Sequence, residues 1–316
     1  MNSLSVIICT WNRADSLRAA LLSLQPQVLP DGVQVDVIVV DNNSSDNTSS
    51  VVAELAAGWT LGTLRYTFEP RQGKQFALNT GISLSTGALL AFTDDDITFP
   101  PDWIATICAA FASPALQLVG GKTLLAWPAG GPPRWYDERM GAILAGVDIG
   151  DQRLAPPPHD YAPAGSNMAA RRALFDQVGT FAETRFRHMD YEFGQRCLAA
   201  GITVAYDPAI VVWAPVDAQV LSKRYFRRWS FKAGFVPSDG SAANAGVPRW
   251  VYRQLLDDLL RLPLDLLSAA PGPRFARELH LWRSWGTIAS GWRARRDPAG
   301  YPAWVQHYSQ KKKNLY

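Results

Sequence analysis

One stretch of the sequence decides the fold: Thr86-Gly87-Ala88-Leu89-Leu90-Ala91-Phe92-Thr93-Asp94-Asp95-Asp96. Its apolar run is typical of a buried strand, and the run ends in three adjacent carboxylates. Like charges at this position repel one another, so a divalent cation that compensates them favours the cluster, and hard oxygen ligands suit Mg²⁺ or Mn²⁺. Since Mg²⁺ sites combine one or two carboxylates with substrate phosphates, the stretch predicts a nucleoside diphosphate ligand. The simpler alternative is a solvated acidic turn.

The residues on the N-terminal side of this stretch alternate strand-like and helix-like patterns. Strands are expected at 4–10, 33–41, 64–68 and 88–93, and helices at 14–24, 51–57 and 73–84. The β-branched run within 33–41 is typical of a parallel strand buried on both faces. The order predicts an α/β fold: a mostly parallel sheet with right-handed crossovers, helices on both faces, and ligands beyond the carboxyl ends of the strands.

The remainder of the chain predicts a looser middle and a helical end. Strands are expected at 163–170 and 210–213, and helices at 171–178, 190–200, 221–235 and 274–292. A further helix starts at Pro248, and Pro263 limits or kinks it. We therefore divide the chain into a catalytic domain at 1–240 and a helical, basic extension at 241–316. Within the domain, about 1–125 would bind the nucleotide and about 126–240 the acceptor.

Composition and charge exclude several classes of protein. The chain has 316 residues, 47% of them hydrophobic, and a formal net charge of +3. From Pro271 onward, nine basic residues face two acidic ones, so the body is mildly acidic and the end is basic. No nucleic-acid-binding motif is present, so we expect no nucleic acid partner. No apolar stretch is long enough to span a membrane, and the N-terminus lacks the features of a signal peptide, which favours a cytoplasmic protein.

Six blocks of sequence, taken in order, resemble glycosyltransferase family 2, whose members are inverting sugar transferases with the GT-A fold. The resemblance covers roughly residues 3–235. It is carried by Ser5–Arg13, Val39–Asp46, Gly73–Gly81, Thr86–Asp96, Gly165–Arg172 and Met189–Glu192.

The resemblance implies a role for each matching position. Thr10, Asn12, Arg13 and Asp41 would hold the nucleobase and ribose of a nucleotide-sugar donor. Lys74, with Arg71 nearby, would lie by the base or diphosphate, and Asp94 and Asp95 by the ribose and diphosphate. Asp96 would bind Mn²⁺ or Mg²⁺. Gly165, Asn167 and Glu192 would lie near the donor sugar or the incoming acceptor, and Asp190 would be the general base.

For several of these residues an ordinary structural role stays open. Lys74 could be a lysine on a helix surface, and Arg13 a solvated residue at a helix start. Asp190 begins the expected helix 190–200, so it could instead be an N-cap. Met189 stands where many relatives have Glu. No His lies near Trp213-Ala214-Pro215, where relatives often supply a metal ligand; His188 could substitute or be an ordinary loop residue.

Three functional classes follow. The first is a metal-dependent inverting glycosyltransferase acting on a glycan or lipid-linked glycan in polysaccharide or glycoconjugate synthesis. The alternative is a non-catalytic relative that binds a sugar nucleotide. A nicotinamide dehydrogenase is excluded because Cys9–Arg13 contains no glycine. The interleaved Arg and Trp of the C-terminal helices suit either peripheral contact with the inner membrane surface or packing on the catalytic domain.

Overall fold

A computed structural model of the protein describes residues 3–158, 161–184, 188–236, 247–268 and 270–310. The chain packs into two compact units. The sheet unit comprises Met1–Leu125, Ala145–Glu183 and His188–Pro215, and the helical unit comprises Ala126–Leu144, Thr184–Arg187 and Val216–Tyr316. We expected a boundary at residue 240. The last part of the helical unit instead starts at Val216, so the helix expected at 221–235 packs within this unit.

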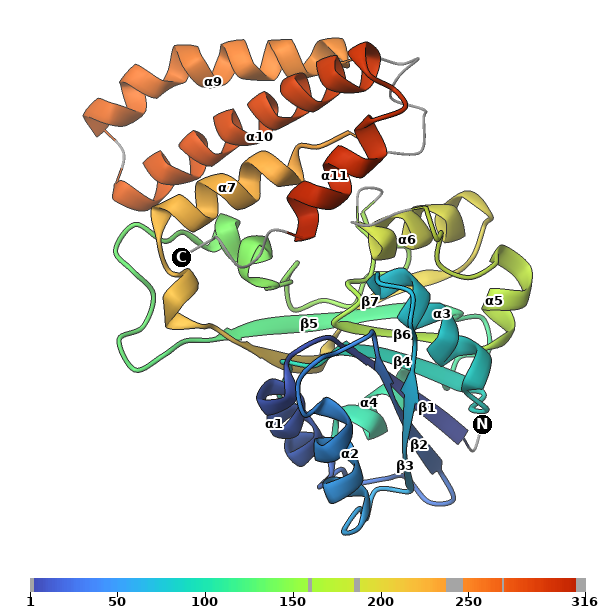
Figure 1. The fold of residues 1–316 in the computed structure, drawn as a ribbon. Coiled ribbons are helices and arrows are strands. Elements are labelled where there is room, and N and C mark those ends of the chain that lie inside the picture. Colours follow the sequence, from blue (N-terminus) through green and yellow to red (C-terminus); the bar gives the residue numbers. More distant parts are fainter. Residues whose placement is uncertain (1–2, 159–160, 185–187, 237–246, 269, 311–316) are drawn as a thin grey trace. The chain divides into compact units, whose positions relative to one another are not determined.

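Seven strands form one sheet in the order β3-β2-β1-β4-β6-β5-β7 (Figure 1). The first four pair in parallel, while β6 runs antiparallel to both β4 and β5. The predicted α/β fold with a mostly parallel sheet is therefore confirmed. The strands are β1 (Ser3–Thr10), β2 (Gln34–Asp41), β3 (Thr63–Phe68), β4 (Leu89–Asp94), β5 (Leu118–Ala126), β6 (Asn167–Arg171) and β7 (Val204–Pro215).

Helices cover both faces of the sheet. One face packs against α1 (Ala14–Leu24), α2 (Thr48–Ala56) and α4 (Trp103–Ala110), and the other against α3 (Lys74–Leu84), α5 (Ala173–Val178) and α6 (Met189–Ala199). Successive side chains of a strand point to opposite faces. Accordingly Val6 and Ile8 join the first apolar core, and Ile7 and Cys9 join the second. Both faces are apolar, which explains the continuous hydrophobic runs of the central strands.

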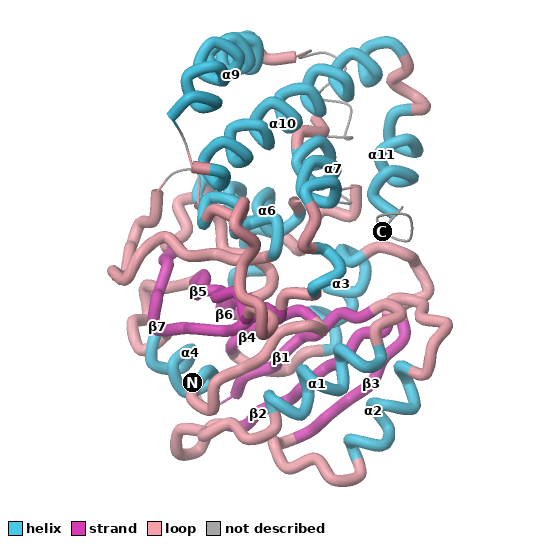
Figure 2. Tube along the Cα trace, turned by 90° about the vertical axis from the view of Figure 1, so that its left-hand side faces the viewer, coloured by secondary structure: helices cyan, strands magenta, loops and turns pink. Residues whose placement is uncertain are grey.

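The helical unit is built around α10 (Pro271–Arg296), which lies between α7 (Lys223–Ala233) and α9 (Arg249–Ser268) (Figure 2). Glycines let α7 and α10 approach closely: a Cβ at Gly286 would lie 1.9 Å from the Phe231 carbonyl oxygen. The unit also contains α11 (Tyr301–Gln310) and the 3₁₀ turns η1 (Glu138–Leu144) and η2 (Ala218–Val220). Among the described residues, no helix is long and apolar enough to cross a membrane.

Several expected elements differ from the structure. The strand expected at 163–170 begins only at Asn167, because Gly165 and Ser166 form a turn closed by the Asn167 N–H on the Ala164 carbonyl at 3.0 Å. The helix expected at 171–178 begins at Ala173, since Arg171 still pairs with Leu89 in the sheet. The helix that starts near Pro248 continues through Pro263 to Ser268, so the proline does not end it. The elements α4, β5 and α11 were not expected.

Candidate functional site

Three parallel strands end side by side at the point where the strand order reverses. The chain runs outward from β1 through β2 to β3, then returns to place β4 on the other side of β1. Thr10 at the end of β1 is in register with Asp41, and Cys9 is in register with Asp94. In sheets of this kind the carboxyl edge at the reversal is where ligands bind. The polar strand ends singled out in the sequence therefore lie together.

Asp95 is the buried anchor of this edge. Its carboxylate accepts hydrogen bonds from the Thr10 hydroxyl at 2.8 Å and from Arg13 Nη1 at 2.9 Å. Burial raises the pKa of Asp95 to about 6, because removal from water outweighs the attraction of Arg13, and the Asp96 and Asp94 charges add to the rise. Asp95 therefore ties β4 to the start of α1.

Arg13 bridges two carboxylates of the triplet. Its Nη1 atom also lies 2.7 Å from Asp96 Oδ2, and both of these side chains are partly exposed. Burial alone would lower the pKa of Arg13, but Asp95 and Asp96 raise it above its ordinary value. Arg13 is thus a fixed cation at the mouth of the site rather than a freely solvated residue at a helix start.

Lys74 compensates the third carboxylate. It is the first residue of α3, and its Nζ atom donates to Asp94 Oδ1. Burial lowers the pKa of Lys74, but Asp94 overrides this and raises it above the ordinary value, and Asp190 contributes in the same direction. The ordinary helix-surface role therefore does not describe this lysine.

Asp190 converges on the same edge from α6. Its Oδ2 atom accepts a hydrogen bond from the Gly165 N–H at 3.0 Å, and its Oδ1 atom accepts one from the Tyr191 N–H at 2.9 Å. A Cβ at Gly165 would lie 3.7 Å from Asp190 Oδ2 and 4.0 Å from Lys74 Nζ. Gly165 is thus the place where the Asp190 carboxylate and the Lys74–Asp94 pair come together.

The capping alternative for Asp190 is not what the structure shows. The N-cap position of α6 is His188, in a left-handed conformation with φ of 55°, and Asp190 is the second residue of the helix. One carboxylate oxygen bonds an amide of the first turn, where a negative charge is favoured. The other oxygen is turned to Gly165, in the loop before β6.

Two loops beside the triplet are bonded to each other. The Ser45 N–H donates to Asn12 Oδ1 at 2.7 Å, and the Asn12 N–H donates to the Ser44 hydroxyl at 2.9 Å. Asp41 is buried and accepts from the Ser44 N–H and the Tyr66 hydroxyl, both at 2.8 Å. The side chains of Asn12 and Asp41 therefore shape the loops of the expected nucleoside pocket.

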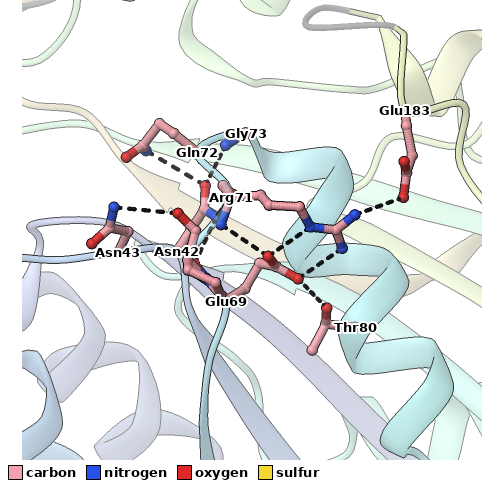
Figure 3. Close-up of polar contacts among 9 residues, drawn as sticks. Asn42, Asn43, Glu69, Arg71, Gln72, Gly73, Thr80 and Glu183 are labelled. Atoms are coloured by element: carbon pink, nitrogen blue, oxygen red, sulfur yellow. Dashed lines mark hydrogen bonds and ion pairs between the residues drawn. The ribbon is translucent and has the colours of Figure 1, made fainter.

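A polar network that the sequence did not reveal fixes the loop before α3 (Figure 3). Asn42 holds this loop at both ends: its Nδ2 atom donates to the Arg71 carbonyl at 2.6 Å, and its Oδ1 atom accepts from the Gly73 N–H at 2.7 Å. Gly73 has φ of +146°, a conformation that favours glycine. Because Lys74 directly follows Gly73, the network fixes the position of the Lys74 backbone.

Arg71 belongs to the same network. Its guanidinium donates to both carboxylate oxygens of Glu69, at 2.9 and 3.0 Å, and more weakly to Glu183 at 3.4 Å (Figure 3). The Thr80 hydroxyl also donates to Glu69 at 2.6 Å. Arg71 also lies over the Phe76 ring, 4.5 Å from its centre. These contacts hold the guanidinium in place, so the geometry favours a positioning role for Arg71. The sequence does contain a signal for this network: Glu69 and Arg71, of opposite charge, flank Pro70.

Two further predicted site residues are engaged elsewhere. Asn167 is buried, and its amide donates to the Lys122 and Ile210 carbonyls at 3.0 and 2.8 Å while accepting from the Trp103 indole at 2.9 Å. Glu192 makes two hydrogen bonds with Arg196, at 3.0 and 3.1 Å. Both side chains already have partners within the protein, so their predicted place beside the sugar stays a prediction.

The charges at this edge fit a divalent cation that arrives with an anionic ligand. Asp94, Asp95 and Asp96 face the two cations Arg13 and Lys74, which leaves one uncompensated negative charge when all five are ionised. Within the described ranges, no three His, Cys, Asp or Glu side chains are arranged to hold a metal. Asp96 is partly exposed and offers hard oxygen ligands, so the residues present fit a Mg²⁺ or Mn²⁺ ion that takes its other ligands from phosphate oxygens.

Comparison with known proteins agrees with this geometry. The model of the family described as Glycosyl transferase family 2 matches residues 5–179. Glycosyltransferase AglE of Haloferax volcanii is 27% identical over 223 residues, which cover 70% of each chain. The pre-mycofactocin glycosyltransferase of Mycobacterium tuberculosis is 25% identical over 294 residues; the match covers 87% of this chain and 57% of that protein.

A solved structure shares the fold. The mannosyltransferase PcManGT of Pyrobaculum calidifontis, solved in complex with GDP-Man and Mn²⁺, matches with a TM-score of 0.55 and 20% identity. The match covers 97% of this chain and 84% of that one. At this identity the likeness shows the GT-A fold alone. Together with the family match over more than half of the sequence, it leads to one conclusion: the chain belongs to glycosyl transferase family 2.

Proposed function

We propose that the protein is an inverting glycosyltransferase that moves a sugar from a nucleoside diphosphate donor to a hydroxyl group of a glycan or lipid-linked glycan. The observation that carries this proposal is the convergence of Asp190 and the Lys74–Asp94 pair on Gly165. It brings a proton acceptor and a partly exposed cation to one edge of the sheet. An in-line displacement needs these two kinds of group on opposite sides of the reacting carbon.

The donor would lie along the carboxyl edge. In this arrangement the loops shaped by Asn12 and Asp41 receive the nucleoside, and Thr10 supports them through Asp95. Arg13 and Lys74 are the cations nearest the acidic triplet, so they would stabilise the negative charge that develops on the departing diphosphate. Asp94 and Asp95 would hold these cations in place, and Arg71 would position Lys74 through its loop.

Asp96 would hold a Mg²⁺ or Mn²⁺ ion, with further ligands from the diphosphate. Such an ion supplies charge stabilisation to the leaving phosphate oxygens. It would also cancel the uncompensated negative charge of the triplet, which otherwise repels an anionic donor.

Asp190 would act as the general base. As the acceptor hydroxyl attacks the anomeric carbon, its proton passes to the Asp190 carboxylate, while the bond from that carbon to the diphosphate oxygen breaks. A positioned base of this kind contributes roughly 10²–10⁴ in rate. The Gly165 N–H fixes one carboxylate oxygen, and the absence of a side chain at Gly165 keeps the space between Asp190 and Lys74 open.

The alternative is a relative that binds a sugar nucleotide without transferring it. We place the protein in the cytoplasm, where nucleotide sugars are made, in polysaccharide or glycoconjugate synthesis.

The test is a panel of nucleotide sugars incubated with the full chain, with and without Mn²⁺, with release of nucleoside diphosphate as the measurement. The proposal expects Mn²⁺-dependent release from at least one donor. Binding of a donor without release from any would favour the non-catalytic alternative.

A further inference from the structure

Helix α9 carries four exposed leucines. Leu256, Leu259, Leu260 and Leu264 recur at spacings of three and four residues, and each is between 49% and 67% exposed. Residues at these spacings share one side of a helix. A helix packed on a domain in water normally has the reverse arrangement, with leucines inward.

The inward side of α9 is partly polar. Asp258 is buried there and forms an ion pair with Arg277 of α10 at 3.3 Å, beside the buried Val251. A carboxylate thus faces the neighbouring helix while these four leucines are exposed. The leucines are therefore not explained by the packing of the helical unit itself.

The neighbouring helix adds exposed tryptophans. Trp285 and Trp292 of α10 are 54% and 64% exposed, and they are seven residues apart, on one side of the helix. We call the four leucines Leu256, Leu259, Leu260 and Leu264, together with Trp285 and Trp292, the outer apolar face. Exposed apolar residues on two helices that pack against each other favour binding to another apolar surface.

A cavity lined by aromatic and basic residues adjoins this face. This cavity of about 370 Å³ lies between α7, α10 and α11, and Trp285 belongs to both the cavity and the outer apolar face. Arg224, Arg227, Arg228 and Lys232 of α7 line it together with aromatic side chains, and most of its exposed wall is apolar. Arg227 is paired there with Glu278 of α10. The charge of the region points the same way: residues 216–316 contain 17 Lys and Arg against 7 Asp and Glu, a net +10 in a chain whose total is +3.

We propose that the helical unit docks on a lipid bilayer that contains anionic lipids. The outer apolar face would lie at headgroup depth, with the tryptophans at the interface, and the positive charge of the region, including Arg224 beside the cavity, would attract anionic headgroups. A second copy of this chain fits less well, because two surfaces with the same strong positive charge repel each other. The inference rests on the helical unit alone and does not depend on the chemistry of transfer.

The test uses the full chain and sedimentation with sucrose-loaded vesicles. Neutral vesicles contain phosphatidylcholine, and anionic vesicles add phosphatidylglycerol. We expect binding at least tenfold tighter to the anionic vesicles. The double variant L256Q/L260Q should weaken this binding at least tenfold, and R224Q should weaken it severalfold on anionic vesicles only. The matched control is L22Q/V28Q, which removes two exposed apolar side chains from the sheet unit and should bind like the wild type.

Circular dichroism and thermal denaturation check that each variant is folded. Since Leu256 and Leu260 are exposed, their replacement should leave the melting temperature unchanged. The proposal is overturned if the wild type does not bind anionic vesicles, or if L256Q/L260Q binds them as well as the control does. It is also overturned if light scattering shows a dimer without vesicles that the same double variant dissociates, because the face would then be an interface between copies.

Discussion

Replacement of Glu69 by glutamine tests how the loop before Lys74 is held. In the wild type the Glu69 carboxylate accepts two hydrogen bonds from Arg71 and one from Thr80. Glutamine keeps the size of the side chain but removes its charge and one of its acceptor oxygens. Among the described residues, the charged partner left to Arg71 would be Glu183, at the longer distance of 3.4 Å.

The magnitude follows from the pKa of Glu69. The hydrogen bonds from Arg71 lower it to about 2 from an ordinary value of 4.5, against the opposing effect of burial, and Thr80 lowers it further. A shift of this size corresponds to about 3 kcal/mol. Because Arg71 is half-exposed and water screens the pair, we expect a loss of about 1–2 kcal/mol in the free energy of unfolding of the sheet unit.

The sign of the pH dependence is fixed by the direction of the shift. A carboxyl group whose pKa is lower in the folded state stabilises the fold above its unfolded pKa, and the stabilisation is lost as the pH falls through the folded pKa. The advantage of the wild type over Glu69→Gln should therefore be full above about pH 5 and fall by more than half by about pH 3. Urea denaturation of both proteins across this range measures it.

The matched control is Glu54→Gln. Glu54 also pairs with an arginine, Arg18, but on the exposed surface of the sheet unit. Its replacement should leave the free energy of unfolding nearly unchanged at every pH. If Glu69→Gln showed the same acid dependence as the wild type, the network would not be held by the charge of Glu69, and the reasoning would be refuted.

Three other replacements probe the site and its framework. Asp96→Asn should weaken Mn²⁺-dependent donor binding at least tenfold because a charged ligand is lost; equal affinity in calorimetry with and without the change would exclude Asp96 as the ligand. Asn167→Ala should lower the free energy of unfolding by about 2–4 kcal/mol, since it strands the buried Trp103 indole N–H; an unchanged melting temperature would contradict this. Gly165→Ala should leave stability within about 0.5 kcal/mol, because its Cβ meets nothing closer than 3.7 Å. It should nevertheless lower kcat/KM, and full activity would show that the space beside Asp190 is not used.

The sequence was informative where a local pattern reports directly on the fold. The β-branched and apolar runs predicted β1, β2 and β4 to within a residue or two, because strands buried on both faces need continuous apolar residues. The ends of these strands follow from the same pattern. The sequence therefore predicts that Thr10 and Asp95 lie near each other, because parallel strands place their carboxyl ends at one edge of the sheet.

Contacts between distant segments were not accessible in the same way. The local sequence does not distinguish an asparagine that faces a ligand from one whose amide makes all its hydrogen bonds within the core. Asn167 is of the second kind, because its amide donates to two buried carbonyls. The same holds for Arg71, whose partner Glu69 is near in sequence but whose second partner, Glu183, is not. Helix α4 was missed because only one of its sides is buried, while the other side carries small or weakly polar residues rather than the charged stripe that reveals a surface helix.

The central claim is that Asp190 takes the proton of the acceptor while other residues hold the donor. Asp190→Asn tests it most directly, since asparagine can still accept the Gly165 N–H and the fold should be kept. Donor affinity in the presence of Mn²⁺ and the rate of sugar transfer are measured on the same preparation. We predict donor binding within about twofold of the wild type and a transfer rate at least ~10²-fold lower. Transfer at the wild-type rate would contradict the claim.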